Sequence, residues 1–474
     1  MQKFTKFYIS NFEFDYKNLQ AKFRYNFDNE VFFEEILDFN NEWFNIREDI
    51  DLVVLDNLLF HLHIALWISY YKSFPTNDLI VESWFLDNFQ LSYWKKFYEN
   101  WLWEFLYTNN ILPKWLFNFV NNSKIKYKKK DYKTSNKSIV AIWWWKDSIV
   151  TIELLKKWWT DFDLVVIWKI DELKQYTSDI SKKKILQIKR QLSLNIFELN
   201  SKWYYNWHVP ITWLIAFILE VTTYLYDYKY IILSNEKSAN FWNVFWKWLN
   251  INHQYSKSLD FEKDFSLYVN KYISSEVKYF SLLRWMYEVK IAKLFSEYWK
   301  QYFNKFSSCN NNFKINSKIN FSLFQRKRPE GSTLGISLQG EGLEKSSYWC
   351  NNCPKCAFVF SILRPYLTEK EVIDIFWEDL YMRKDLEKLF RELLGLSGIK
   401  PFECVWESEE VIYSMYLTLS KYTYNLPFIL KIFQEEILPK INNQEFENIE
   451  KKLVTIYNDD IIPLDLKKII FMNI

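Results

Sequence analysis

The chain has 474 residues, 49% of them hydrophobic and 25% charged, and its 61 basic and 58 acidic side chains give a formal charge of +3. That length suffices for roughly two or three domains with a sizeable core. So small a net charge argues against a global attraction to nucleic acid or to a membrane surface. No run of about 18 apolar residues predicts a transmembrane span, and the opening MQKFTKFYISNFEFDYKN lacks the apolar stretch of a signal peptide. We therefore expect a cytoplasmic protein with no nucleic acid, membrane or obligate protein partner.

Glycine and tryptophan occur in abnormal numbers. Average glycine usage would give roughly 33 glycines in a chain of this length, yet the chain has 6 glycines and 24 tryptophans. Trp158 and Trp159 follow an apparent helix where a C-cap glycine belongs. Trp143 to Trp145 lie at a strand-to-helix turn that needs small residues. We interpret many of these tryptophans as UGA codons that the source organism reads as glycine, and UGG codons at Trp143–Trp145 would exclude this interpretation.

Residues 1–125 predict an N-terminal α+β domain, followed by a linker at 126–137. Apolar residues recur at helical spacing within 44–72 and 89–107. The stretch NNSKIKYKKKDYKTSNK, at 121–137, is polar and basic and has no hydrophobic period. It is interpreted as solvated chain rather than as a nucleic-acid site.

Short apolar strands alternate with helices between residues 138 and 306. A helix at 210–228 has Pro210 in its first turn, and another helix is expected from 284. The expected strands are 138–142, 161–168, 194–200 and 229–236. This alternation predicts an α/β fold with a doubly wound parallel sheet.

Residues 307–474 predict a helical C-terminal region that begins with a cysteine cluster. Long amphipathic stretches at 370–394 and 408–437 indicate helices. The polar stretch at 324–346 is interpreted as an insertion before the cysteines.

The sharpest motif is SIVAI-WWWKDS-IVTIELLKK, at 138–157. With glycine at the three tryptophans it becomes a strand, GGGKDS and a helix. That pattern resembles the SGGxDS pyrophosphate-binding loop of the ATP pyrophosphatase (PP-loop) superfamily. Glycines let backbone N–H groups close around phosphate oxygens, and the N-terminus of the following helix adds positive potential. The GK[ST] ending of a Walker loop is missing, which disfavours a kinase-type site.

Each residue of this loop has an expected role in binding ATP. The glycines read at Trp143, Trp144 and Trp145 would supply backbone N–H groups, and Lys146 would add charge. Asp147 would orient the loop or hold Mg²⁺, which prefers carboxylate and phosphate oxygens, and Ser148 would donate a hydrogen bond to phosphate. Literal tryptophans would obstruct a phosphate and leave an aromatic-rich turn instead.

Four of the five cysteines predict a structural zinc site. Cys350, Cys353 and Cys356 have CxxC spacing in SYWCNNCPKCAF, and Cys309 precedes them in FSSCNNNF. Four thiolates suit a closed tetrahedral zinc shell in a reducing compartment, and an iron–sulfur cluster is the minor alternative.

Polar side chains cluster in the stretches at 202–213, 232–246 and 250–265. Ser234 to Asn240 directly follow an apolar strand, at the edge where open α/β sheets bind ligands. His208 and His253 lie in these stretches and are two of only four histidines.

Read with glycine restored, a run of motifs resembles the UDP-N-acetylmuramoyl-L-alanyl-L-glutamate epimerase family. The motifs are NGHVPITG, LSNEKSANFGN, NHQYSKSLDFEKDF, YFSLLRGMYEVKIAKLF, FSSCN, WCNNCPKCAFVF and FRELLGLSGIKPFECVGE. YWKKFYENWLWEFLY in the first domain also fits, with Trp94 as a genuine tryptophan. The resemblance covers nearly the whole chain, and the tail after about 415 is its least diagnostic part.

This resemblance implies an enzyme of peptidoglycan precursor synthesis that uses ATP and Mg²⁺. It would convert the terminal L-glutamate of UDP-MurNAc-L-Ala-L-Glu, a nucleotide-sugar dipeptide, to D-glutamate through an acyl-adenylate, releasing AMP and pyrophosphate. Proton transfer at Cα then requires bases on two faces or one mobile base. The candidates are His208, Glu236, His253 and Asp264, with Cys404 as a possible thiol base.

Two other functions remain open. Another PP-loop enzyme, acting on a nucleobase or on tRNA, predicts AMP release that depends on that base or RNA, together with a basic face. A non-enzymatic, aromatic-rich binding module requires literal, exposed tryptophans and no ATP turnover.

Overall fold

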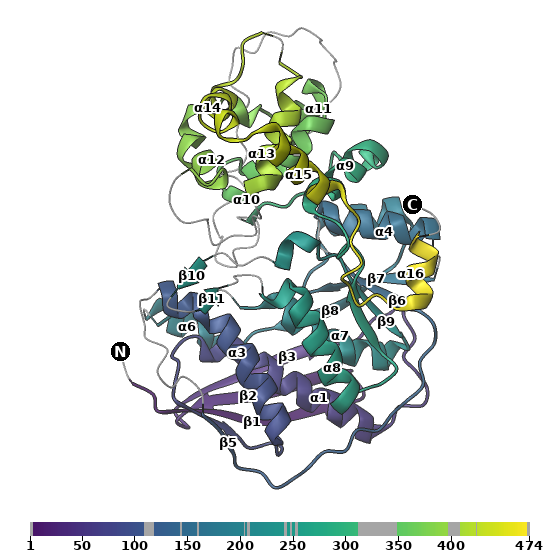
Figure 1. Cartoon of the computed structure of the whole chain (residues 1–474). Coiled ribbons are helices and arrows are strands. Elements are labelled where there is room, and N and C mark those ends of the chain that lie inside the picture. Colours follow the sequence, from purple (N-terminus) through teal and green to yellow (C-terminus); the bar gives the residue numbers. More distant parts are fainter. Residues whose placement is uncertain are drawn as a thin grey trace, which may run out of the picture. The chain divides into compact units, whose positions relative to one another are not determined.

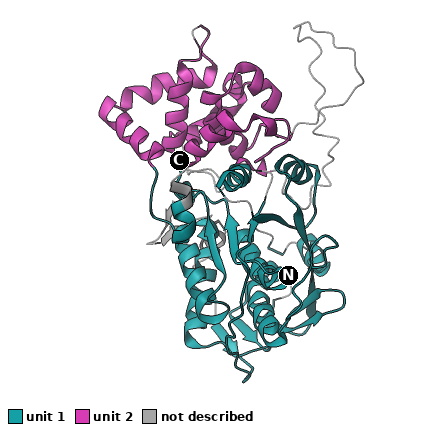
Figure 2. Ribbon diagram, turned by 90° about the vertical axis from the view of Figure 1, so that its right-hand side faces the viewer, with its two compact units in different colours: residues 1–143, 147–286, 456–474 teal, residues 144–146, 287–455 magenta. Residues whose placement is uncertain are grey.

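The computed structural model describes residues 3–108, 118–142, 145–158, 161–202, 204–205, 209–240, 244–246, 249–251, 255–310, 348–396, 408–422 and 424–471. The chain forms two compact units (Figures 1 and 2). Unit 1 comprises residues 1–143, 147–286 and 456–474, and unit 2 comprises residues 144–146 and 287–455.

Unit 1 begins with an antiparallel meander of three strands, β1 (Lys6–Asp15), β2 (Gln20–Phe27) and β3 (Val31–Asp38). Buried and exposed residues alternate along them, as expected for strands with one covered face. Asp28 and Asn29 form the turn between β2 and β3 with φ of +47° and +59°. Asp and Asn tolerate this left-handed conformation better than most residues, so the turn chemistry fixes the hairpin.

The meander continues into a mixed ten-stranded sheet. Its order is β12-β9-β6-β7-β8-β3-β2-β1-β4-β5. β12, β9, β6, β7 and β8 are mutually parallel, and β8 joins β3 antiparallel, with Ile36 opposite Gln191. The further strands are β4 (Asp78–Val81), β5 (Asn118–Asn121), β6 (Ser138–Ala141), β7 (Phe162–Ile167), β8 (Ile185–Gln191), β9 (Tyr230–Leu233) and β12 (Lys278–Ser281). The expected α/β class with a parallel sheet is therefore present, but that sheet is one half of a larger mixed one.

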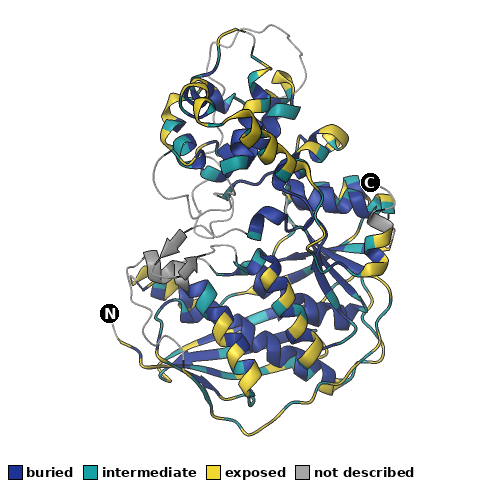
Figure 3. Ribbon diagram, viewed as in Figure 1, coloured by how far each residue is buried: buried dark blue, intermediate teal, exposed yellow. Residues whose placement is uncertain are grey.

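Four helices of unit 1 lie side by side in front of the sheet in Figure 1. They are α1 (Leu52–Leu66), α3 (Asn88–Thr108), α7 (Ile211–Tyr226) and α8 (Leu259–Tyr272). Every residue of α7 after Ile211 is buried, and α1 is buried from Leu58 to Leu66. Figure 3 shows the same pattern, with the darkest ribbon in the strands and in the inner helices of this unit. The core therefore lies between these helices and the sheet.

The segment Leu52–Tyr71 is long and apolar enough to cross a membrane by composition alone. It comprises α1 and the short α2 (Ile68–Tyr71). However, 83% of its most apolar window is buried inside the protein. Its apolar composition is thus explained by its position in the core, where it packs as one of the helices that cover the sheet.

Unit 2 is helical in its described part. Its main helices are α9 (Glu288–Tyr298), α10 (Pro354–Leu363), α11 (Glu369–Phe376), α12 (Glu387–Leu393), α13 (Ser408–Leu419), α14 (Phe428–Glu436) and α15 (Asn443–Val454). α11 and α15 both begin with a capping box, at Thr368 and Asn442. α16 (Leu464–Phe471) returns to unit 1, where Asp465 accepts a hydrogen bond from Tyr230.

One predicted strand is wrong. Residues 194–200 belong to a helix, α6 (Asn195–Ser201), and the strand that precedes it is β8. Ile196 and Leu199 are buried while Leu194 and Phe197 are exposed, which is helical i, i+3 spacing. β8 was missed because its sequence, ILQIKRQ, carries buried residues only at Leu186 and Ile188, and the charged Lys189 and Arg190 follow them.

The domain limits expected from the sequence remain predictions, because nothing in the structure tests which segments fold independently. In the structure, β3 from 1–125 and β8 from 138–306 share one sheet, so both segments contribute to unit 1. No helix or strand occurs between Asn122 and Lys137, all of which are described. The expected linker is nevertheless attached to unit 1. Lys129 donates to the Asn270 carbonyl at 2.8 Å, and Asp131 accepts from Ser275 at 2.8 Å.

Two tryptophans adopt left-handed backbone conformations. Trp168, directly after β7, has φ +84°, and Trp377, the C-cap of α11, has φ +68°. L-residues with a large side chain disfavour this region, whereas glycine enters it freely. At the end of a helix, this is the position where glycine is most common. Both positions fit the interpretation that these letters stand for glycine.

Candidate functional site

The expected phosphate loop follows the central strand of the parallel half-sheet. β6 ends at Ala141 and α4 (Lys146–Trp158) begins with the KDS of the motif, while Trp143 and Trp144 lie outside the described residues. Asp147 and Ser148 are both buried in the first turn of α4. A carboxylate in this turn is favoured by the positive end of the helix dipole.

The strand order places a topological switch beside this loop. From β6 the chain adds β7 and β8 on one side, and then returns to add β9 and β12 on the other. The reversal therefore falls between β6 and β9. In open α/β sheets the crevice outside the carboxyl ends of the strands at such a reversal is the usual ligand site.

The residues that follow β9 lie at the same edge of the sheet. Ser234, Asn235 and Glu236 come directly after this strand, and a short 3₁₀ turn, Lys237–Asn240, follows them. Asn235 and Glu236 are buried, and the Asn235 amide donates to Ser281 at the end of β12 at 2.9 Å. The structure therefore brings the carboxyl ends of β9 and β12 together with that of β6. Ser234 to Asn240 follow β9 at this edge, as the sequence predicted.

A buried ion pair that sequence reasoning missed supports this edge. Arg284 contacts Glu262 at 2.6 Å, and both side chains are completely buried. Arg284 also donates to the carbonyl of Glu236 at 2.6 Å and to that of Lys257 at 2.5 Å. Glu262 Oε1 also accepts from Ser281. The guanidinium thus fixes the backbone of the loop that carries Glu236. The only sequence signal was the position of Arg284 shortly after an apolar strand.

The remaining predicted bases are distributed differently. Asp264, on α8, accepts from Tyr255, in the 3₁₀ turn before that helix, at 3.0 Å, and pairs with Lys96 of α3 at 2.5 Å. His208, His253 and Cys404 lie outside the described residues. The other two histidines, His61 and His63, are buried in α1, where Tyr268 lies 2.9 Å from His61 Nδ1.

Trp145 and Lys146 belong to unit 2. Lys146 is completely buried, and its ammonium contacts the Glu288 carboxylate. Its side chain therefore does not project into solvent, and its charge is paired within the protein. Trp145 is partly buried, with the Lys355 ammonium 5.5 Å from its ring centroid.

The four predicted zinc ligands gather in unit 2. Their sulfur atoms all lie within 4.8 Å of one another, and none of the four cysteines forms a disulfide. Cys356 Sγ is 3.4 Å from Cys353 Sγ and 3.7 Å from Cys350 Sγ. Tetrahedral zinc with Zn–S bonds of about 2.3 Å places sulfurs roughly 3.8 Å apart, so the cluster fits that ion.

Local structure builds this cluster. Cys353 caps the N-terminus of α10, and its sulfur accepts from the Cys356 N–H at 3.4 Å. Asn351 takes a left-handed φ of +56°, and the Asn352 N–H approaches Cys350 Sγ at 3.5 Å. These backbone donors face the sulfurs and would stabilise thiolates. The insertion at 324–346 lies outside the described residues.

Comparison with known proteins gives two family matches. The model described as the MurL N-terminal domain matches residues 1–282, and that described as the MurL C-terminal domain matches residues 338–447.

Three similar curated proteins carry the name UDP-N-acetyl-alpha-D-muramoyl-L-alanyl-L-glutamate epimerase. The protein from Xanthomonas oryzae pv. oryzae is 27% identical over 387 residues, which make up 81% of this chain and 80% of that protein. Those from Micromonospora sp. and Salinispora tropica are 34% and 32% identical over 167 residues. These alignments span 35% of this chain and 31% and 30% of the two relatives.

Proposed function

The chain belongs to the MurL family, and from that premise we propose that it epimerises the terminal L-glutamate of UDP-MurNAc-L-Ala-L-Glu to D-glutamate. The observation that carries the proposal is the name shared by the three relatives, one of which aligns over 81% of this chain. The proposed reaction belongs to peptidoglycan precursor synthesis. We place it in the cytoplasm, because four clustered cysteines that form no disulfide suit a reducing compartment.

We propose that ATP activates the substrate. An oxygen of the glutamate α-carboxylate attacks the α-phosphorus of ATP, and the bond to the β-phosphate oxygen breaks as pyrophosphate leaves. The resulting acyl-adenylate has lost the carboxylate charge that opposes removal of the Cα proton. A base then takes that proton and a proton returns on the opposite face. Water finally cleaves the mixed anhydride to AMP and the D-glutamate carboxylate.

The switch between β6 and β9 supports a PP-loop-like ATP site, which remains part of the proposal. Asp147 and Ser148 follow β6, and Glu236 follows the neighbouring β9 at the same edge. In this proposal Ser148 donates to phosphate and Asp147 holds Mg²⁺, a hard cation that neutralises the departing pyrophosphate. Trp143 to Trp145, as glycines, supply backbone N–H groups.

The proton-transfer residues are proposed from the same edge. Glu236 is the described candidate there, because Arg284 fixes its backbone. His208 and His253 come from the neighbouring polar stretches and remain candidates with it. Asp264 is the weaker candidate because its carboxylate is already paired with Lys96 and Tyr255.

A single incubation tests this function. Protein with glycine at 143–145 is supplied with UDP-MurNAc-L-Ala-L-Glu, ATP and Mg²⁺, and the glutamate is released by acid and analysed on a chiral column. We expect D-glutamate and AMP to appear together. AMP without D-glutamate would favour another PP-loop activity, and unchanged ATP and L-glutamate would contradict the proposal. The chain with tryptophan at these positions is the matched comparison.

A further inference from the structure

Three charged side chains are buried together in unit 2. Lys146, Glu288 and Lys355 are each at most 1% exposed. Glu288 bridges the two lysines: its Oε1 lies 3.1 Å from the Lys355 ammonium, and its Oε2 contacts that of Lys146. Burial of an ammonium is costly unless a carboxylate compensates it. Glu288 therefore supplies counter-charge to both lysines.

The three residues come from three different features of the chain. Lys146 is the first residue of α4 and lies in the phosphate-loop motif. Glu288 is the first residue of α9, where a helix favours a carboxylate. Lys355 lies between Cys353 and Cys356 in the first turn of α10. Glu288 consequently links the phosphate-loop motif to the cysteine cluster.

Glu288 lies between two positively charged side chains, Lys146 and Lys355, and their charges determine its ionisation. Burial alone raises the pKa of Glu288, but Lys146 and Lys355 outweigh it and hold that pKa below its ordinary value. The carboxylate is therefore ionised and shared between two cations. Moving either lysine changes the counter-charge available to the other, so the position of Lys355 affects the position of Lys146.

We propose that Glu288 is a positioning residue that couples the metal site to the ATP loop. In this arrangement, metal held by the cysteines fixes Lys355, Glu288 transmits that position, and Lys146 anchors the start of α4 instead of contacting phosphate. The inference rests on the proposed function, because it takes 143–148 as the ATP loop. It predicts that ATP and metal stabilise each other's binding by the same factor, as thermodynamic linkage requires.

The rate of zinc loss measures this coupling. Full-length, zinc-loaded protein is mixed with a colorimetric chelator, with and without saturating Mg·ATP and without the muramoyl substrate. We expect Mg·ATP to slow zinc release about tenfold, within the usual range of allosteric coupling. Glu288→Gln, which keeps the side-chain size but removes the charge, should lose this slowing while still binding zinc and ATP.

Matched variants separate positioning from general stability. Lys355→Met should also abolish the slowing, and it keeps the Glu288–Lys146 pair should Glu288→Gln fail to fold. Glu35→Gln removes a carboxylate that is equally buried, paired with Arg190 at 2.6 Å in unit 1, and should retain the slowing. A purely structural role for Glu288 would accelerate zinc loss equally with and without Mg·ATP, leaving their ratio unchanged.

The outcomes distinguish this inference from the proposed function. Equilibrium dialysis with ATP is run on the same samples. If the parent protein neither binds ATP nor epimerises its substrate, both proposals are overturned. Parent protein that binds ATP and epimerises, but holds no zinc or releases it at an ATP-independent rate, overturns the coupling alone. The same slowing in Glu288→Gln as in the parent also overturns it.

Discussion

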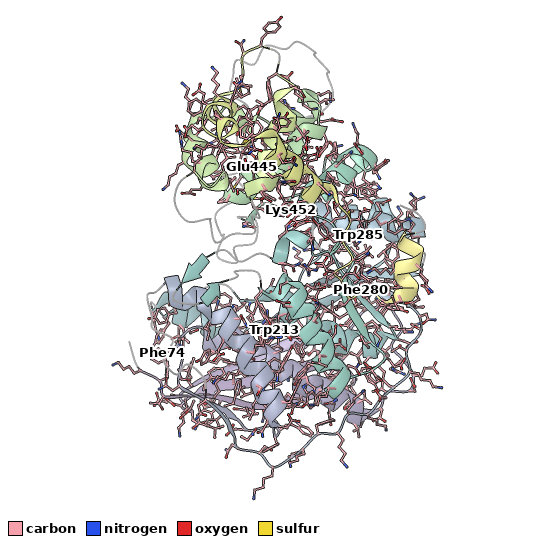
Figure 4. All side chains as sticks on the ribbon, viewed as in Figure 1. Phe74, Trp213, Phe280, Trp285, Glu445 and Lys452 are labelled. Atoms are coloured by element: carbon pink, nitrogen blue, oxygen red, sulfur yellow. The ribbon has the colours of Figure 1, made fainter. Side chains whose placement is uncertain are left out.

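Trp168 and Trp377 hold backbone conformations that an indole side chain opposes. A left-handed L-residue costs roughly 1–2 kcal/mol, and neither ring is fully buried to offset that cost. By contrast, Trp94 is completely buried, and its indole N–H donates to Tyr268 at 3.0 Å. Trp213, labelled in Figure 4, is equally buried, but its indole nitrogen has no hydrogen-bond partner among the described residues. The local structure thus separates tryptophans whose side chains are buried in the core from those whose backbone conformation favours glycine.

We expect Trp168→Gly and Trp377→Gly each to raise the free energy of unfolding by about 1 kcal/mol, because each relieves left-handed strain. Urea unfolding followed by circular dichroism measures the change. Trp94→Gly is the control and should lower the free energy of unfolding by about 3–5 kcal/mol, since it leaves a cavity and removes the indole hydrogen bond to Tyr268. A loss of stability in both left-handed variants would show that these rings belong to the native protein.

Asp147 offers the residue-scale test of the ATP loop. Asp147→Asn keeps the side-chain volume but removes the charge proposed to hold Mg²⁺. Losing one such electrostatic contact costs about 2.7–4 kcal/mol of barrier, so epimerisation and AMP release should fall together by roughly a hundred- to thousandfold. Coupled assays of both products measure this, with zinc content as the control that should stay constant. Unchanged AMP formation would place the ATP site elsewhere.

At the scale of elements, the sequence predicted best where one pattern dominated. β6, β7, β9 and α7 were expected because uninterrupted apolar runs end at clear turn signals. α6 was misassigned because seven residues hold too few turns to distinguish periods of 2 and 3.6. The first meander was hidden by aromatic residues on both faces, such as exposed Phe32 beside buried Phe33.

The candidate site was predictable where its residues are neighbours in sequence. The KDS at the start of α4 and the CxxC turns before α10 are recognisable from a few consecutive residues. Arg284 and Glu262 are 22 residues apart, and Lys146 and Glu288 are 142 apart. Such pairs form only when the sheet and the helices have brought their elements together, so no local spacing indicates them.

The cysteine turns and α10 form an element whose stability should depend on metal. We expect about one zinc per chain, and Cys353→Ser should lose it, because this substitution removes a thiolate ligand while its hydroxyl can still cap α10. Unit 2 should then lose protection from hydrogen exchange before unit 1. Elemental analysis and hydrogen-exchange mass spectrometry measure these effects. Cys404→Ser, which leaves all four clustered cysteines in place, is the control. Folded parent protein without zinc would refute the assignment.

At the scale of the whole molecule, one sheet joins segments that the sequence presents as separate domains. The pairing of β3 with β8 continues the antiparallel meander into the parallel half. Because β8 is an edge strand of the parallel set, the meander extends the sheet without covering the switch between β6 and β9. The extension was unpredictable, since strand partners distant in sequence are chosen by tertiary packing rather than by local pattern.

Three buried ionisable groups on the helices that cover this sheet make the stability of the protein depend on pH. Burial lowers the pKa of His61 and of His63 from an ordinary 6.5 to about 3. Burial raises the pKa of Glu220, on α7, from 4.5 to about 8. Neither carboxylate oxygen of Glu220 has a hydrogen-bond partner among the described residues. Tyr132 and Tyr279 lie close enough to sense its charge.

These groups should give the protein a stability maximum near pH 6.5. Between pH 3 and 6.5 the unfolded chain binds a proton at each histidine that the folded chain does not, so stability rises with pH. Between pH 4.5 and 8 the folded chain keeps the Glu220 proton that the unfolded chain has lost, so this group alone lowers stability by about 1.4 kcal/mol per pH unit. The two histidines outweigh Glu220 below pH 6.5, and above that pH only the loss from Glu220 remains.

Urea unfolding from pH 5 to 8.5 should therefore show a free energy of unfolding that declines above pH 6.5. Glu220→Gln should abolish this decline, and Glu435→Gln, at an exposed position, should leave it unchanged. A decline of equal slope in Glu220→Gln would mean that this carboxyl group is ionised inside the folded protein.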